Sequence, residues 1–365
     1  MVDGLTLADI SSASADATNV AAICGRLLGH DVVSVERIAG GRNSQVYRLD
    51  CRDDGHPARF VAKQYYSVPE DPRDRLQTEF QALRFLKEHN IADVPGPIAI
   101  DVASRVASFE FVDGVRASEH PIGPVETHQA LDFLIALRAL ARRNDAQSVG
   151  PASEACFSID AILDNVHARL ARLLALPPEA PGVSALLQFL GDRFVPFAAT
   201  LDDWSADAAR AAGIPRDADV DTTDRTLSPS DFGFHNALRG ASGRLVFVDF
   251  EYFGWDDPAK TLVDFLLHPG MNVTDDQKRA FASGLLAGFS DVARLPARAR
   301  IVYPLFGLKW CLILLNEFVP EHLRRRSFAS AAAESRTDLL GPQLSRAERL
   351  LDRLNAEYRH NSYFE

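Results

Sequence analysis

The chain has 365 residues, enough for about two domains with a substantial hydrophobic core. Its 47% apolar and 24% charged residues are typical of an ordered globular protein rather than a disordered one. The net charge of −11 argues against a nucleic-acid partner, which usually requires a basic face, and mildly favours a neutral or cationic substrate.

The N-terminus lacks the positive region and apolar core of a signal peptide. The longest apolar run, Val302 to Leu315, contains Pro304 and Lys309 and is too short to cross a bilayer, so we expect a buried core helix and no membrane partner. Four widely spaced cysteines without a CxxC pair predict reduced, packed thiols of a cytoplasmic protein.

The pattern of residues changes along the chain near Asp113-Gly114. Helical spacing over 15–28, with Ser14 or Asp16 as cap, precedes a region dominated by strand patterns. The expected elements there are strands at 32–38, 45–49, 59–66 and 105–112, and a helix at 72–88. Residues 125–215 and 275–358 have helical periodicity, and a short β segment lies between them. We predict an α+β fold of two lobes, a small β-rich N-lobe at 1–112 and a larger, mainly helical C-lobe at 113–365.

Lys63 lies on an apolar strand face with Val61 and Tyr65. A strand lysine often extends its ammonium to solvent. However, Glu79 falls within the apolar stripe of the following helix, where a carboxylate is costly unless it is paired. Lys63 is its natural partner, and a strand lysine paired with a helix glutamate positions the α- and β-phosphates in kinase folds.

The stretch Gly40-Gly41-Arg42-Asn43-Ser44 lies between the first two strands. It suits either an ordinary hairpin turn or a backbone that curls over phosphates, with Gly41 and Ser44 as phosphate-binding candidates. No GxGxxG or GxxxxGK[ST] occurs in the chain, which excludes the usual dinucleotide fingerprint and the P-loop.

The richest motif runs from Ser228 to Asn236 and continues into the strand that ends at Asp249. Phosphoryl transfer needs a carboxylate that orients the attacking hydroxyl, and an amide oxygen and a carboxylate that hold Mg²⁺. Asp231, Asn236 and Asp249 are of these types in this order. A hairpin formed by 237–248 would bring Asn236 and Asp249 close together, as a hard divalent cation requires.

Several neighbouring residues have simpler explanations. Glu251 is either an auxiliary metal ligand or a solvated side chain, and Asp257-Pro258 is typical of a helix N-cap followed by proline at the first turn. His235, Asp264 and His268 are expected to be core or loop polar groups.

Together these residues resemble the aminoglycoside phosphotransferase and choline kinase-like family, which has a protein-kinase-like fold. The resemblance runs from about Val35 to Pro269 and includes Phe109-Glu110-Phe111-Val112-Asp113-Gly114. It implies that Asp231 is the catalytic base, that Asn236 and Asp249 bind Mg²⁺, and that Lys63 with Glu79 orients ATP. It also implies that the backbone from Glu110 to Val112 reads the adenine edge.

One position departs from the family pattern, because Pro229 replaces the usual histidine two residues before the catalytic aspartate. The predicted function is an ATP- and Mg²⁺-dependent kinase that acts on a small-molecule hydroxyl, such as that of an aminoglycoside, choline, an amino-alcohol or a sugar. A nucleotide-binding, pseudokinase-like regulator is the alternative, and a non-enzymatic helical interaction protein gives no reason for the five polar residues together.

Overall fold

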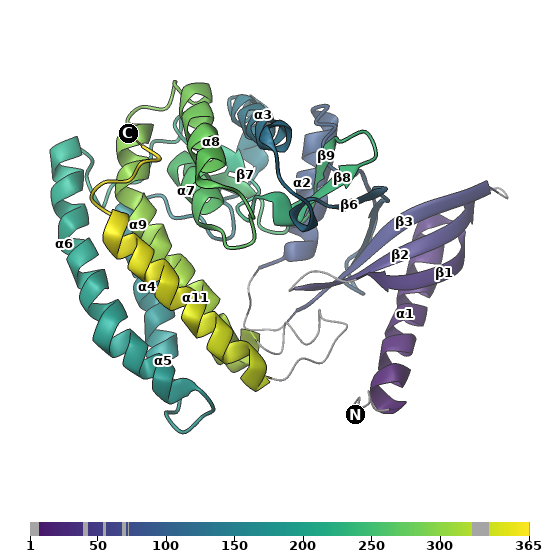
Figure 1. The fold of residues 1–365 in the computed structure, drawn as a ribbon. Coiled ribbons are helices and arrows are strands. Elements are labelled where there is room, and N and C mark those ends of the chain that lie inside the picture. Colours follow the sequence, from purple (N-terminus) through teal and green to yellow (C-terminus); the bar gives the residue numbers. More distant parts are fainter. Residues whose placement is uncertain are drawn as a thin grey trace. The chain divides into compact units, whose positions relative to one another are not determined.

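The computed structural model describes residues 7–38, 43–53, 56–67, 71, 73–322 and 336–364 (Figure 1). The chain forms two compact units. The first contains the described residues up to Gly114 together with Val246–Glu251, and the second contains Val115–Leu245, Tyr252–Pro320 and the C-terminal helix. The predicted α+β class, with a β-rich N-terminal part and a helical C-terminal part, is confirmed.

A five-stranded antiparallel sheet organises the first unit, in the order β1-β2-β3-β5-β4. Its elements are α1 (Leu7–Leu28), β1 (Asp31–Ile38), β2 (Ser44–Asp53), β3 (His56–Tyr65), α2 (Arg75–Glu88), β4 (Pro97–Asp101) and β5 (Val106–Glu110). The predicted hairpin is the β2–β3 pair, with Val46 opposite Lys63. The helix expected at 15–28 begins earlier, at Leu7, so the caps expected at Ser14 and Asp16 are wrong.

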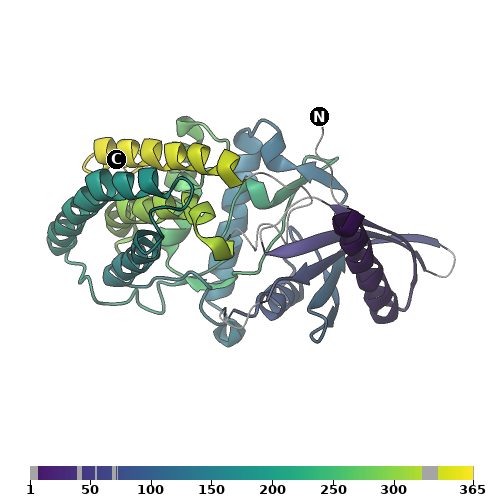
Figure 2. The same cartoon turned by 90° about the horizontal axis from the view of Figure 1, so that it is seen from below.

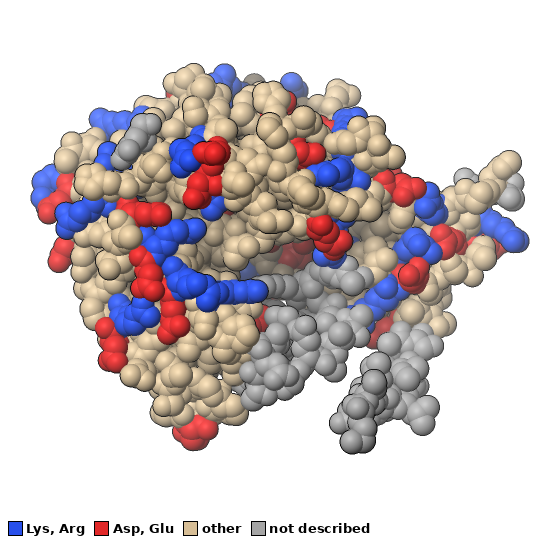
Figure 3. Space-filling view, in the orientation of Figure 1, with Lys and Arg blue, Asp and Glu red and all other residues tan. Residues whose placement is uncertain are grey.

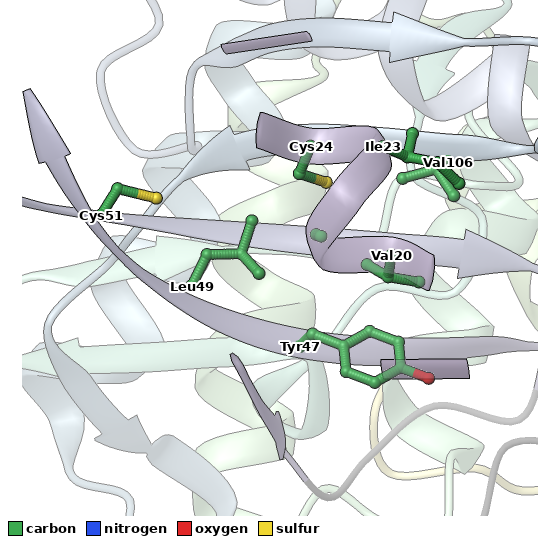
Figure 4. Packing of buried hydrophobic residues seen from close by; sticks show 8 residues of the cluster. Val20, Ile23, Cys24, Tyr47, Leu49, Cys51 and Val106 are labelled. Atoms are coloured by element: carbon green, nitrogen blue, oxygen red, sulfur yellow. The ribbon is translucent and has the colours of Figure 1, made fainter. Parts of the chain in front are cut away.

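Helix α1 covers one face of this sheet, and the two elements share an apolar cluster (Figure 2). Figure 4 shows side chains of α1 directed toward those of the sheet. The buried members are Val20, Ile23, Cys24, Tyr47, Leu49, Cys51, Ala62 and Val106. Because side chains alternate along a strand, Ala62 in this cluster places its neighbour Lys63 on the opposite face. The cluster therefore fixes which face of β3 carries the lysine.

Helix α2 begins beside a buried ion pair. Arg75 is almost completely buried and donates to Asp71 over 2.7 Å, and Arg73 donates to the same carboxylate over 2.7 Å. Burial by itself favours the neutral carboxyl of Asp71, but the hydrogen bonds from Arg73 and Arg75 outweigh it and hold the pKa of Asp71 well below its usual range.

The second unit is mainly helical. Its helices are α3 (Pro124–Ala141), α4 (Ile159–Leu174), α5 (Val183–Phe189), α6 (Val195–Ala212), α7 (Pro258–Leu267), α8 (Asp275–Gly288), α9 (Leu295–Leu314) and α11 (Arg336–Glu357). A short helical turn, η1 (Ala117–Glu119), precedes α3, and others lie between the helices at η2 (Asn144–Ser148), η3 (Leu190–Phe194), η4 (Phe234–Asn236) and η5 (Asn316–Phe318). The predicted cap at Asp257 is confirmed, because its carboxylate accepts from the Ala259 amide at the start of α7.

Helix α9 is the apolar centre of this unit, and α11 lies along it in both views (Figures 1 and 2). The stretch Leu295–Phe318 is long and apolar enough to cross a membrane, yet 78% of its apolar window is buried. That burial is typical of a core helix, as the interrupted run at Val302 to Leu315 predicts. On the face shown in Figure 3, basic and acidic side chains alternate over the helical unit without a basic stripe.

Short strands carry the motif that contains Asp231. Strand β7 (Thr226–Ser228) pairs with β10 (Gly254–Asp256), while β6 (Gly114–Arg116), β8 (Ala237–Gly240) and β9 (Leu245–Phe247) form a second small sheet. The predicted hairpin is present as β8–β9, but its turn is shorter than expected because Gly240 still belongs to the strand. The Gly240 amide donates to the Arg244 carbonyl and closes the turn.

We predict that Leu49→Ala, which removes a fully buried side chain from the α1 cluster, lowers the free energy of unfolding by about 2–5 kcal/mol. Val33→Ala is the control, since Val33 is 58% exposed and its truncation should change stability by less than about 0.5 kcal/mol. Urea denaturation measures both values. Equal losses in the two variants would contradict the packing of α1 on the sheet.

We also predict that Asp71→Asn destabilises the protein by about 3 kcal/mol at pH 7, because the buried Arg75 loses the ionised carboxylate that accepts its 2.7 Å hydrogen bond. The folded-state pKa of Asp71 is depressed, so its stabilisation is complete above the unfolded pKa of about 3.9 and is lost as the pH falls through the folded pKa. The gap between wild type and variant should therefore shrink below about pH 4.

Denaturant titrations across pH measure this gap. Asp207→Asn is the matched control, because Asp207 and Arg210 form an exposed ion pair and should contribute less than about 1 kcal/mol at any pH. A gap for Asp71→Asn that is the same at pH 3 and pH 7 would refute the ionic role of Asp71.

Candidate functional site

Lys63 and Glu79 are in direct contact within the first unit. The Lys63 ammonium on β3 donates to both carboxylate oxygens of Glu79 on α2, over 2.7 and 3.0 Å. Tyr65, on the same strand face as Lys63, donates its hydroxyl to Glu79 over 2.6 Å. Both members of the ion pair are buried. The apolar stripe of α2 thus tolerates its carboxylate because β3 supplies a cation and a hydroxyl to it.

Asp249 joins the same ammonium from a distant part of the sequence. It follows β9 and accepts from Lys63 over 3.0 Å. Its backbone has a φ of 70°, a left-handed conformation that is rare for a residue with a side chain and costs about 1–3 kcal/mol. Such strain is concentrated at functional sites, where the surrounding structure holds it in place. One oxygen of Asp249 is occupied by Lys63, and from the described residues no hydrogen bond reaches the other.

The charge of Lys63 is maintained by these neighbours. Burial alone lowers the pKa of a lysine, but Asp249 and then Glu79 outweigh it and raise the pKa of the ammonium above its ordinary value. The group therefore stays cationic at any physiological pH. A fixed cation between two carboxylates is suited to binding an anionic ligand without a change of its own protonation state.

Glu251 lies at the edge of this cluster and is only 3% exposed, so its interpretation as a solvated side chain is wrong. It accepts from the side chain of Asn43 over 2.5 Å and lies 3.8 Å from the Arg75 guanidinium. Burial, and next the neighbouring Asp249 carboxylate, raises the pKa of Glu251 to about 8. Through Glu251, the last residues of the glycine-containing motif are tied to the segment that carries Asp249.

The remaining nucleotide candidates lie elsewhere in the first unit. Ser44 is buried at the start of β2, opposite Tyr65, whereas Gly41 falls outside the described residues. Glu110 ends β5, and its amide donates to the carbonyl of Gly96 over 2.8 Å. Val112 follows that strand before β6 begins. Their proposed roles in binding ATP stay predictions.

The loop that carries Asp231 in the second unit is closed by a tight turn at Ser230. The Asp231 amide donates to the carbonyl of Pro229 over 2.8 Å, across Ser230 with a φ of 66°. This pattern is that of a γ-turn with positive φ, which is rare and strained. The Ser228 hydroxyl accepts from the Ser230 amide, and the Ser230 hydroxyl accepts from Lys260 over 2.8 Å.

Lys260 anchors this turn from α7. Its ammonium is buried and lies 2.8 Å from Asp256 and 3.0 Å from Asp264. Burial opposes the charge of Lys260, but Asp256 and Asp264 outweigh it and raise the pKa of Lys260. The turn at Ser230, one residue after Pro229, is therefore held by a permanent charge.

Asn236 is oriented by the same loop. Its amide nitrogen donates to the main-chain carbonyl of Asp231 over 2.9 Å, which fixes which end of the amide is a donor and leaves the Oδ1 oxygen as the end able to bind a cation. A carboxylate and an amide oxygen fit the preference of Mg²⁺ for oxygen ligands. Because Asn236 and Asp249 belong to different units, their meeting at one ion stays a prediction.

Two histidines, expected to be core or loop polar groups, lie beside the side chain of Asp231. His235 Nε2 lies 3.0 Å from Asp231 Oδ1, and His268 Nε2 lies 3.6 Å from the same oxygen. Their rings stack with centroids 3.8 Å apart. His235 was recognisable from its place four residues after Asp231, whereas His268 follows α7 and reaches the site only through the tertiary fold.

Gly233 allows this arrangement by its lack of a side chain. A Cβ at this position would lie 2.2 Å from Met271 Sδ and 2.9 Å from His235 Nδ1. The backbone between Asp231 and His235 thus passes directly against neighbouring side chains, and a larger residue at 233 would require Met271 and His235 to move.

The sequence profile of the phosphotransferase enzyme family matches residues 34–302. No curated protein sequence matches the chain. Among solved structures, a spectinomycin phosphotransferase determined with ADP and spectinomycin has a TM-score of 0.59 at 11% identity, covering 91% of this chain and 98% of that one.

Choline kinase of Streptococcus pneumoniae has a TM-score of 0.56 at 15% identity, covering 94% and 99% of the two chains. An ethanolamine kinase of Plasmodium vivax has a TM-score of 0.55 at 12% identity, covering 88% and 83%. At these identities the likeness shows a shared fold, which confirms the predicted kinase-like architecture. The profile match covers well over half of the sequence, and it confirms the predicted enzyme class: the chain belongs to the phosphotransferase enzyme family and is a small-molecule kinase.

Proposed function

We propose that the protein transfers the γ-phosphoryl group of ATP, with Mg²⁺, to a hydroxyl of a small molecule. The observation that carries this proposal is the buried Lys63 ammonium held between Glu79 and Asp249. A cation fixed in this way can neutralise the negative charge of polyphosphate oxygens without any rearrangement of the protein. The family match and the ADP-bound neighbour support a nucleotide donor.

The first unit supplies the nucleotide contacts in this proposal. Lys63, oriented by Glu79, binds α- and β-phosphate oxygens, and Gly41 and Ser44 lie in the stretch that would cover them. The backbone of Glu110 to Val112 reads the adenine edge, next to the strand that carries Lys63.

Asn236 and Asp249 would hold Mg²⁺, each through the oxygen that its own hydrogen bonds leave available. When bound, the ion supplies charge neutralisation for the phosphate oxygens. The chain's own contribution is to fix these two oxygens through Asp231 and Lys63, so that little conformational entropy is lost on binding.

Asp231 would orient the acceptor hydroxyl and take its proton late in the reaction. Its carboxylate is partly exposed, whereas its main chain is held by the Ser230 turn and by Asn236. A base that is fixed in place but open to solvent on one side is what an incoming hydroxyl needs. The alternative of a regulator without turnover is not favoured, since Asp231 and both predicted metal ligands are retained.

The acceptor belongs to the hydroxyl-bearing small molecules on which the family acts, such as aminoglycosides, choline and other amino-alcohols. The chain's net charge of −11 favours a cationic member of this set. A cytoplasmic location is part of the proposal, supported by four buried cysteines that form no disulfide.

We predict that Asp231→Asn keeps nucleotide affinity within about twofold while turnover falls by about 10²–10⁴-fold, the usual contribution of a general base. ADP release with a panel of aminoglycosides, choline and ethanolamine measures turnover, and calorimetry measures binding. Asp132→Asn is the control, because Asp132 is exposed on α3. Full turnover by Asp231→Asn would refute its role, and a wild type that never binds ATP would refute the proposed function.

We predict that Asp249→Asn removes the effect of Mg²⁺ on ATP affinity. Wild type should bind ATP at least about tenfold more tightly with Mg²⁺ than without it, a difference of about 1.4 kcal/mol, and the variant should bind equally in both conditions. Asp276→Asn, at an exposed position in α8, should behave as wild type. A variant that responds to Mg²⁺ as wild type does would exclude Asp249 as a ligand.

A further inference from the structure

We propose that His235 and His268 are positioning residues that hold the Asp231 carboxylate, in place of the catalytic-loop histidine that Pro229 replaces. The inference rests on the proposed function, in which Asp231 is the base. It goes beyond that function by assigning a task to two residues outside the proposed catalytic, metal-binding and nucleotide-binding set.

The first argument is the convergence of two imidazoles on one oxygen. His235 Nε2 is at hydrogen-bond distance from Asp231 Oδ1, at 3.0 Å, and His268 Nε2 lies 3.6 Å from that atom, close enough for electrostatic attraction but too long for a full hydrogen bond. Because an ionised carboxylate only accepts, the Nε2 atom of His235 must carry a proton. The ring nitrogens of both histidines therefore lie nearest to Oδ1 of Asp231.

The second argument fixes the tautomer of His268. Its Nδ1 accepts a hydrogen bond from the Gly270 amide over 3.1 Å. In a neutral ring the proton must then lie on Nε2, the nitrogen that faces Asp231. The turn that follows α7 thus places the His268 proton on the nitrogen nearer to Asp231.

The third argument is that the two rings support each other. They stack with planes only 7° apart, and Trp310 contacts His268 edge to face at 4.7 Å. The Trp310 indole in turn donates to Asp264 over 2.8 Å, and Asp264 pairs with Lys260. Lys260, which anchors the Ser230 turn, therefore also fixes the position of Trp310 through Asp264.

The geometry favours hydrogen bonding over a metal ion at these three residues. Their ligand atoms lie within 4.8 Å of one another, as a metal site would require. However, imidazole binds metals through a lone pair in the ring plane, and two stacked parallel planes share no point that lies in both. A single ion cannot be in plane with His235 and His268 as they stand.

The test uses matched substitutions of the full-length protein. The amide nitrogen of glutamine lies near the place of imidazole Nε2, whereas that of the shorter asparagine lies near Nδ1. We expect His235→Gln to keep turnover within about fivefold of wild type and His235→Asn to lose about 10²-fold, with an unchanged KM for ATP. For His268 we also expect the Asn variant to lose more turnover than the Gln variant, but both losses should be smaller because the contact of His268 with Asp231 is longer.

His128→Asn is the control, since His128 on α3 faces an exposed aspartate at a similar distance. It should match wild type in turnover and KM. Equal turnover in the Gln and Asn variants of His235, or a loss that appears only in the KM for ATP, would overturn the positioning role.

A second readout does not depend on activity. In ¹⁵N-histidine NMR of wild type, we expect both His235 and His268 to carry a proton on Nε2, and His235 to change its signal in Asp231→Asn while His128 does not. A wild type that binds ATP but phosphorylates no tested acceptor would count against the proposed function, while these spectra would still decide the inference. An Nδ1 proton on His268, or tight Zn²⁺ binding in calorimetry that His235→Asn abolishes, would overturn it.

Discussion

The ammonium of Lys63 is the interaction on which the first unit depends. It joins three segments, β3, α2 and the residue after β9, through contacts of 2.7 to 3.0 Å. A buried charge without partners would cost several kcal/mol, so each of these segments is constrained to the position that satisfies it. The α1 cluster on the other side of the sheet determines the face of β3 on which the lysine lies. Packing and electrostatics therefore specify the same register of β3.

A second buried ammonium, Lys260, has the corresponding place in the helical unit. It stabilises the loop that carries Asp231 through the hydroxyl of Ser230. The same loop contains the strained turn at Ser230 and passes close to Met271 at Gly233, so its conformation is constrained at both positions. The loop around Pro229 is thus held by a network that involves α7 and the turn after it.

What could be predicted from the sequence follows from local rules. A carboxylate such as Glu79 in an apolar helical stripe is costly without a cationic partner. Lys63 on the preceding strand could supply that charge, so their contact could be inferred. The hairpin β8–β9 followed from its turn residues. Strand β4 was missed because the prolines at 95 and 97 weaken the strand pattern, which is tolerated at the edge of a sheet. The contacts of Asp249 with Lys63, 186 residues away, and of His268 with Asp231 depend on tertiary packing that no local pattern encodes.

The division of the chain into two units limits which fragments can be expressed separately. Val246–Glu251 belongs to the first unit, although the residues on both sides belong to the second. A fragment that ends near Gly114 would contain Lys63, Glu79 and Arg75 but would lack Asp249 and Glu251. Its buried ammonium would lose one of its two carboxylate partners, and its buried guanidinium would lose a neighbour. The first unit is therefore not obtained whole by truncation near Gly114, and a minimal version would need the 246–251 segment to be rejoined to it through a linker.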